Sequence, residues 1–138
     1  VRVSLMPQKF ADILEPKMQK IESRIHEINR LKDLGWEVHI NYSPLVFTHG
    51  WKDEYRNLFE AVKEIAGVNK CEVIALTNHH YQMVRSSPEA QELMKYSCEV
   101  KNNSGVMRYP LKWKTGWLNE FKKEYEKFFP LDTIRYIF

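Results

Sequence analysis

The sequence CEVIALT at residues 71–77 has the composition of a strand inside a parallel sheet. Its apolar run from Val73 to Leu76 is typical of a strand that is buried on both faces. A second strand pattern, WEVHINY at residues 36–42, alternates apolar and polar side chains. Between the two, apolar residues recur every three or four positions from Trp51 to Ile65, and Gly67 ends the pattern. This order predicts two parallel strands joined by a helical crossover.

The same patterns extend the prediction to both ends of the chain. Upstream, they predict a short strand at residues 1–5, a proline-bounded loop at 6–16 and an amphipathic helix at 17–34. Downstream, they predict loops at 43–50 and 78–87, a short helix at 88–96, hairpin strands at 97–101 and 106–109, a helix after Lys114 and a strand at 134–138. The fold class is therefore α/β, with parallel β/α units in residues 1–96. Residues 97–138 add a hairpin, a helix and a closing strand to the same domain.

Composition and charge exclude several classes of protein. Of the 138 residues 43% are apolar and 28% are charged, which indicates an ordinary folded domain rather than a disordered chain. The net charge is only +3, so any nucleic-acid site must depend on local clusters of basic residues. No apolar run approaches the ~20 residues of a membrane span, and the opening residues do not resemble a signal peptide. With two distant cysteines, Cys71 and Cys98, we expect a cytoplasmic protein with reduced thiols and no membrane partner.

The first residues of the chain already form a strand pattern and include no initiator methionine. Three β/α units make only half a barrel, and a half barrel leaves strand edges that need a cover. We therefore expect a fragment whose N-terminal half is encoded upstream or supplied by a second chain.

Five groups of short segments follow one another along the whole chain. They are Arg2-Val3-Ser4-Leu5 with Glu15-Pro16 and Arg24-Ile25; Ser43-Pro44-Leu45-Val46 with His49-Gly50-Trp51; Asn78-His79-His80-Tyr81; Gly105-Val106-Met107-Arg108-Tyr109 with Lys112-Trp113; and Ile134-Arg135-Tyr136-Ile137-Phe138. In this order and at this spacing they resemble the spore photoproduct lyase family of radical S-adenosylmethionine enzymes. The resemblance implies the second half of a partial (β/α)6 TIM-like barrel.

The resemblance also implies the chemistry of the presumed full-length protein, a carbon–carbon lyase for DNA repair. The family binds a [4Fe-4S] cluster and S-adenosylmethionine, whose reductive cleavage gives a radical that restores two thymines from the spore photoproduct dimer. The family's cluster motif, C-x3-C-x2-C, is absent from this sequence. The family's hydrogen-donating cysteine lies upstream of the matched part. We therefore expect no metal ligand and no catalytic residue in this chain, and no activity of the chain alone.

What the resemblance carries over is part of a cofactor site. Ser4 matches a serine at the end of a strand that meets S-adenosylmethionine, and Ser43 and Pro44 match a segment beside its adenine. His79 matches a histidine in the loop after the next strand. Ligands of α/β folds bind where strands end, so the predicted locations agree with the strand pattern. The family often has alanine in place of Ser43, which favours a backbone contact there.

The predicted hairpin is the candidate DNA element. Arg108 and Tyr109 match an arginine–tyrosine pair on the lesion-recognising hairpin of the family. An arginine can pair with a phosphate and a tyrosine can stack on an exposed base. Lys112 and Trp113 add a basic and an aromatic group nearby. The proline at position 110 and the Asn-rich turn depart from the glycine-rich family version.

Each of these assignments has a structural alternative. Ser4 and Ser43 could simply end their strands, and Arg108 and Tyr109 could be an ordinary cross-strand pair. For the function, three alternatives stay open: a radical enzyme that acts on another substrate, a non-catalytic nucleic-acid-binding α/β module, and a small α/β interaction domain with no cofactor.

Overall fold

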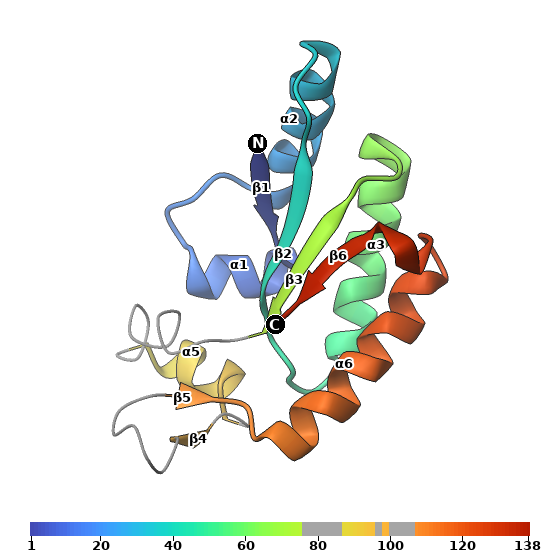
Figure 1. The fold of residues 1–138 in the computed structure, drawn as a ribbon. Helices are drawn as coiled ribbons and strands as arrows, with labels where there is room; N and C mark the ends of the chain where they lie inside the picture. Colours follow the sequence, from blue (N-terminus) through green and yellow to red (C-terminus); the bar gives the residue numbers. More distant parts are fainter. Residues whose placement is uncertain (76–86, 96–97, 100–106) are drawn as a thin grey trace.

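Four parallel strands form the sheet of this protein (Figure 1). The computed structural model describes residues 1–75, 87–95, 98–99 and 107–138, and only the backbone of 98, 99, 107 and 108. The strands are β1 (Arg2–Leu5), β2 (His39–Leu45), β3 (Cys71–Ala75) and β6 (Ile134–Ile137), in the spatial order β1-β2-β3-β6. All three pairings are parallel, which confirms the predicted α/β class.

Three helices lie on one face of this sheet (Figure 1). They are α2 (Ile21–Asp33), α3 (Trp51–Ala66) and α6 (Leu111–Glu126). The remaining elements are α1 (Gln8–Leu14), α5 (Pro88–Leu93), the two-residue strands β4 (Cys98–Glu99) and β5 (Met107–Arg108), and a 3-10 turn at Leu131–Thr133. No helix in the described part of the chain is long and apolar enough to cross a membrane.

The core between the sheet and the helices is aromatic. Tyr42 of β2 meets the ring of Phe59 on α3 edge to face, with 5.5 Å between centroids. On α6, Phe121 lies 5.5 Å from Phe59, and Tyr125 lies 5.4 Å from it. Edge-to-face pairs of this kind add to the large apolar area that each ring buries. These contacts fix α3 and α6 against the same side of the sheet.

Side chains that alternate with Tyr42 point to the opposite side, here called the open face. Ser4 pairs with Asn41, and Asn41 pairs with Glu72, so the three form one row across β1, β2 and β3. Tyr136 of β6 pairs with Glu72 and continues the row. Because successive residues of a strand point to opposite faces, this polar row lies away from the helices.

Several predicted boundaries were wrong. Residues 6–16 were predicted as a loop, but they contain α1, in which Phe10, Ala11 and Leu14 are buried at helical spacing. Strand β2 runs through Ser43 and Pro44 to Leu45, where a loop was predicted. Helix α6 begins at Leu111, directly after Pro110, rather than after Lys114. The predicted loop at 78–87 and the turn of the hairpin lie almost wholly outside the described residues.

Candidate functional site

The row on the open face contains an acceptor without a donor. The side-chain oxygen Oδ1 of Asn41 is buried and has no hydrogen-bond partner among the residues that the structure describes. Its neighbour Glu72 is held instead by Arg2, whose Nη2 lies 3.1 Å from Oε1. Buried polar groups in folded proteins are nearly always paired, so an orphan indicates a site that another group completes. The sequence signal for this site was the alternation of residues 36–42, which placed Asn41 on the polar face.

The backbone of Ser4 is held in place by Arg24 of α2. The Nη1 of Arg24 donates to the backbone carbonyl of Ser4 at 3.2 Å. The same side chain donates to Oε2 of Glu15 at 2.7 Å and to the carbonyl of Gln19 at 3.0 Å. Arg24 is buried, so these contacts fix the end of β1 relative to α2. The half-buried side chain of Ser4 lies on the open face beside Asn41.

Ser43 and Pro44 end the neighbouring strand, and both are buried. The peptide bond between them is cis. The hydroxyl of Tyr55 accepts a hydrogen bond from the N–H of Val46 at 3.1 Å and donates to the carbonyl of Pro44 at 3.5 Å. Burial raises the pKa of the Tyr55 phenol, so it stays protonated and able to donate. The structure thus brings two predicted cofactor residues, Ser4 and Ser43, to the same edge of the sheet, whereas His79 lies outside the described residues.

The four predicted DNA residues are placed differently from one another. The backbone of Arg108 pairs with Cys98 between β5 and β4, and its side chain is outside the described part. Tyr109 is only 4% exposed, and its ring packs against Phe47 and Trp117. The Tyr109 ring is therefore part of the core. Its phenol oxygen also accepts a hydrogen bond from the N–H of Phe47. A stack between Tyr109 and a base would require this packing to open.

Lys112 and Trp113 lie on the first turn of α6 and are accessible. Lys112 is exposed, and Trp113 is 49% exposed with its ring 5.8 Å from Trp117. A basic group beside an exposed aromatic ring can serve a phosphate and a base together. These two, rather than Tyr109, are therefore the accessible part of the predicted DNA element.

The described residues include no set of side chains that could bind a metal cluster. No group of three His, Cys, Asp or Glu side chains there could hold a metal ion. Cys71 faces the core, and its Sγ lies 3.4 Å from the hydroxyl of Tyr125. Burial raises the pKa of the Cys71 thiol to about 11, so it is not a thiolate at neutral pH. The residues that the structure describes do not fit a [4Fe-4S] cluster.

The imidazole of His39 links two strands at the other end of the open face. Nδ1 lies 3.0 Å from Nη1 of Arg135 on β6, and Nε2 lies 2.9 Å from Oε1 of Glu37. Arginine offers only donors, so Nδ1 accepts and Nε2 carries the proton. The sequence placed His39 on the polar side of its strand but gave no sign of these partners, which come from distant segments.

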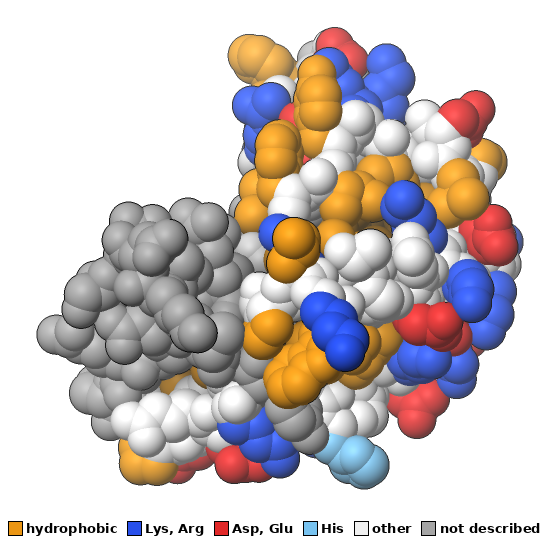
Figure 2. Space-filling view, turned by 60° about the horizontal axis from the view of Figure 1, so that its bottom comes forward, with side chains coloured by type: hydrophobic (Ala, Val, Ile, Leu, Met, Phe, Trp, Pro, Cys, Tyr) orange, Lys and Arg blue, Asp and Glu red, His pale blue; other side chains and the backbone are white. Residues whose placement is uncertain are grey.

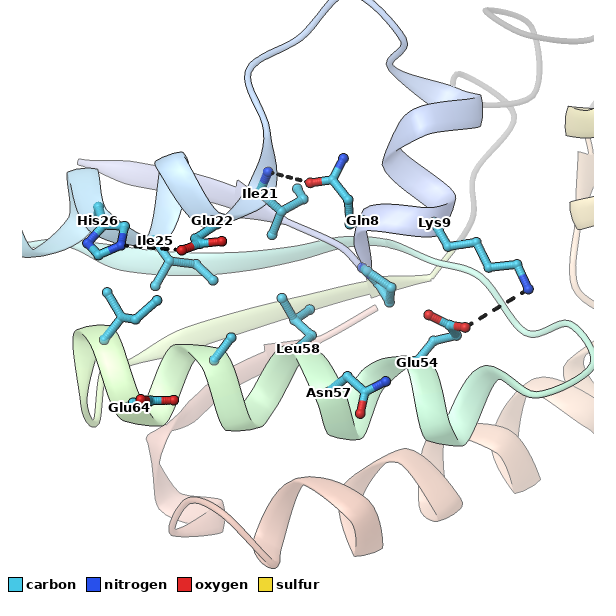
Figure 3. Close-up of a pocket in the computed structure, with 13 residues that line it drawn as sticks. Gln8, Lys9, Ile21, Glu22, Ile25, His26, Glu54, Asn57, Leu58 and Glu64 are labelled. Atoms are coloured by element: carbon cyan, nitrogen blue, oxygen red, sulfur yellow. Dashed lines mark hydrogen bonds and ion pairs between the residues drawn. The ribbon is translucent and has the colours of Figure 1, made fainter.

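A cavity lies elsewhere, on the helix side of the molecule (Figure 3). It has a volume of about 700 Å³ and is open to solvent between α1, α2 and α3. Ile25 and Leu58 contribute to its apolar lining, and an ion pair between Lys9 and Glu54 lies at one end. None of the predicted cofactor or DNA residues whose side chains the structure describes lines it, so this cavity is separate from the described part of the predicted site.

The surface around the strand ends carries no broad patch of one charge in its described part. Figure 2 shows hydrophobic side chains in a band up the middle of this face, with lysine, arginine and acidic side chains intermingled on its right. This distribution agrees with the small net charge of the chain.

The arrangement of strands and helices can be compared with solved structures. A variant of spore photoproduct lyase with bound AdoMet and dinucleoside spore photoproduct matches 99% of this chain with a TM-score of 0.73 and 17% identity. The chain has the fold of spore photoproduct lyase. The same enzyme complexed with dinucleoside spore photoproduct matches with a TM-score of 0.70 and 15% identity. No protein-family model matches the chain, and no curated protein sequence matches it significantly.

The spore photoproduct lyase fold confirms the predicted resemblance at the level of architecture. The match covers 43% of each of these spore photoproduct lyase chains, so this chain spans less than half of their length. The four-stranded sheet with helices on one face is consistent with part of a barrel.

Proposed function

We propose that this chain is the C-terminal part of a radical S-adenosylmethionine DNA-repair lyase that reverses the spore photoproduct thymine dimer. The observation that carries the proposal is the structural match over 99% of the chain to spore photoproduct lyase with bound AdoMet and dinucleoside spore photoproduct. The order of the matched segments in the sequence supports it independently.

The residues at the strand ends fit S-adenosylmethionine. When bound, this cofactor supplies the radical chemistry of the reaction. Ser4 offers a hydroxyl, Asn41 offers an unpaired buried acceptor, and Ser43 and Pro44 offer backbone groups of a fixed segment. The hydroxyl and amino groups of the cofactor can donate a hydrogen bond to the unpaired oxygen of Asn41. His79 remains a proposed cofactor residue.

The cluster ligands must come from outside the described residues of this chain. The proposal assigns them to an N-terminal half, encoded upstream or present on a second chain. No catalytic residue is assigned to this chain, and by itself it is proposed to be inactive. The role of this chain's own residues is to bind, orient and shield, because the strand ends and Arg24 hold the open face in place.

Residues 97–138 are proposed to recognise the lesion within the same domain. Lys112 and Trp113 are exposed where α6 begins, directly after the strand that carries Arg108. In this proposal Arg108 pairs with a phosphate, Lys112 adds charge, and Trp113 supplies the stacking surface. Tyr109 supports the hairpin from the core and meets DNA only if its packing opens.

The decisive experiment compares two ligands that differ only in the lesion. Binding of the dinucleotide spore photoproduct and of unmodified thymidylyl thymidine, both with the bridging phosphate, to the chain would be measured by ligand-observed NMR. We expect the lesion to bind more tightly, and Arg108→Ala to remove most of that preference. Equal binding of both dinucleotides would overturn the lesion assignment.

A non-catalytic nucleic-acid-binding module is the second candidate. It is favoured by the absence of cluster ligands among the described residues. Under this candidate the chain binds DNA without preferring the lesion, and S-adenosylmethionine does not bind at all. Equilibrium dialysis with labelled S-adenosylmethionine, using Asn41→Ala as the control, separates the two. A radical enzyme with a different substrate would bind the cofactor but not prefer the lesion.

A further inference from the structure

Two aromatic side chains lie exposed side by side at the end of β6, one on the strand and one directly after it. Tyr136 and Phe138 are 51% and 59% exposed, and their rings are stacked with 6.0 Å between centroids and 24° between planes. The guanidinium of Arg135 lies 5.5 Å from the centre of the Tyr136 ring. Large exposed aromatic residues that cluster, rather than occur singly, mark an interaction surface.

This strand is the last of the sheet. In Figure 1, β6 has β3 on one side and α6 nearby, and no further strand of the described chain pairs with it. A hollow of about 300 Å³ follows this edge, lined by Lys122, Leu131, Ile134, Arg135, Tyr136 and Ile137. The edge thus combines an aromatic surface with two cationic side chains.

The cation from α6 is available to a ligand. The ion pairs of that helix use Lys123 with Glu120 and Lys127 with Glu124. Lys122 takes part in none of the ion pairs among the described residues. Arg135 is oriented by its bond to Nδ1 of His39, which accepts a hydrogen bond but does not neutralise the guanidinium charge. Both cations therefore keep their attraction for an anion.

We propose that the edge of β6 binds a nucleotide of single-stranded DNA. The base stacks on the rings of Tyr136 and Phe138, and the phosphate lies between Lys122 and Arg135. An aromatic platform beside cationic side chains is the combination by which proteins bind single strands without reading their sequence. The inference rests on the proposed function only in taking DNA as the ligand. It adds residues that belong neither to the hairpin nor to the predicted cofactor residues, at the β6 end of the row on the open face.

The test uses the 138-residue chain with a fluorescein-labelled thymidylate decamer and a labelled decamer in which every position is abasic. Tyr136→Ala should weaken binding about tenfold, because one base–aromatic stack contributes roughly 1–3 kcal/mol. Tyr136→Phe keeps the ring and should bind like the wild type. The exposed position makes both variants tolerable to the fold, and a urea denaturation curve would verify this.

The phosphate contact is tested with two neighbouring lysines. Lys122→Gln should weaken binding and lower the slope of log affinity against log salt by about 0.7, the value for one phosphate contact of a single strand. Lys123→Gln is the matched control, since its Nζ already lies 2.9 Å from Oε1 of Glu120. Equal effects of the two substitutions would overturn the proposed phosphate contact.

Three further results would overturn the proposal. They are no binding of the thymidylate decamer by the wild type, no loss of its binding on Tyr136→Ala, and an equal loss on Tyr136→Ala for the thymidylate decamer and the fully abasic decamer. These outcomes are separate from those of the proposed function. If the preference for the lesion dinucleotide persists while Tyr136→Ala has no effect, only the proposed stacking on Tyr136 and Phe138 fails. If Tyr136→Ala weakens DNA binding but the chain does not prefer the lesion, the lyase proposal fails and a nucleic-acid-binding module remains.

Discussion

The backbone N–H of Phe47 donates a hydrogen bond of 2.9 Å to the phenol oxygen of Tyr109. Sixty-two positions separate the two residues, which join the loop after β2 to the end of the hairpin. Burial raises the pKa of the Tyr109 phenol, so the hydroxyl stays neutral at every ordinary pH. The bond makes Tyr109 a structural support between the barrel-like sheet and the segment that precedes α6.

Tyr109→Phe should lower the free energy of unfolding by about 1–3 kcal/mol. The substitution keeps the ring but leaves the buried N–H of Phe47 without an acceptor. Urea denaturation measures the change. Tyr136→Phe is the matched control, because its exposed hydroxyl should contribute almost nothing. If both variants unfold like the wild type, the hydrogen bond does not support the fold.

Arg24→Lys should destabilise the protein although it keeps the charge. A lysine cannot reach Glu15, Gln19 and the carbonyl of Ser4 together, because its single ammonium group lacks the guanidinium fork. We expect a loss of roughly 2 kcal/mol and faster hydrogen exchange at the backbone of residues 15–20, measured by NMR. Arg30→Lys on the exposed side of α2 is the control. Unchanged hydrogen exchange at residues 15–20 would contradict the proposal that Arg24 holds this segment in place.

Stability should fall in acid through Glu124. Hydrogen bonds from Arg56 hold the pKa of the Glu124 carboxyl at about 2, below its ordinary value of 4.5. A lowered folded-state pKa means that the stabilisation is complete above pH 4.5 and is lost as the pH falls toward 2. Because Arg56 is 40% exposed, solvent screens the pair and we expect only about 1–2 kcal/mol.

The measurement for Glu124 is the free energy of unfolding of the wild type and of Glu124→Gln between pH 7 and pH 2. The difference between the two proteins should be largest at pH 7 and should shrink below pH 4.5. A difference that stays constant over this range would show that the carboxylate charge is not what stabilises the fold.

Cys71 should resist thiol reagents in the folded protein. The side chain is fully buried, and burial raises its pKa to about 11, so thiolate is scarce at pH 8. In a Cys98→Ser background, we expect reaction with Ellman's reagent to be at least a hundredfold slower than in denaturant, where a cysteine has its ordinary pKa. Rapid reaction under native conditions would mean that the core around Tyr125 opens readily.

Much of the architecture was accessible from local patterns. The alternation at 36–42, the apolar run at 73–76 and the periodicity from Trp51 to Ile65 were enough to predict parallel β/α units. Local patterns failed where an element was short. Helix α1 has seven residues between two prolines, and its three buried positions are too few to stand out from a loop.

The candidate site was predictable in position but not in its partners. Ser4 and Ser43 follow from strand ends and from the family resemblance. Three features of the site depend on which residues far apart in the chain come together. They are the unpaired oxygen of Asn41, the hydrogen bond from Arg24 to Ser4 and the hydrogen bond from Arg135 to His39. Tyr109 shows the same limit, since a tyrosine beside an arginine on a hairpin has no local sign that its ring is buried.

The sequence by itself determined the order of the parallel strands and of the longer helices between them, the absence of a C-x3-C-x2-C motif and the family resemblance. These properties depend on residue type and spacing, which the chain carries locally. The tertiary structure alone decided which polar side chains share the open face, that Tyr109 supports the core, and that Tyr136 and Phe138 remain exposed at the end of the edge strand. The physical reason is that burial and pairing are set by the register and order of strands, which bring together residues that no local pattern connects.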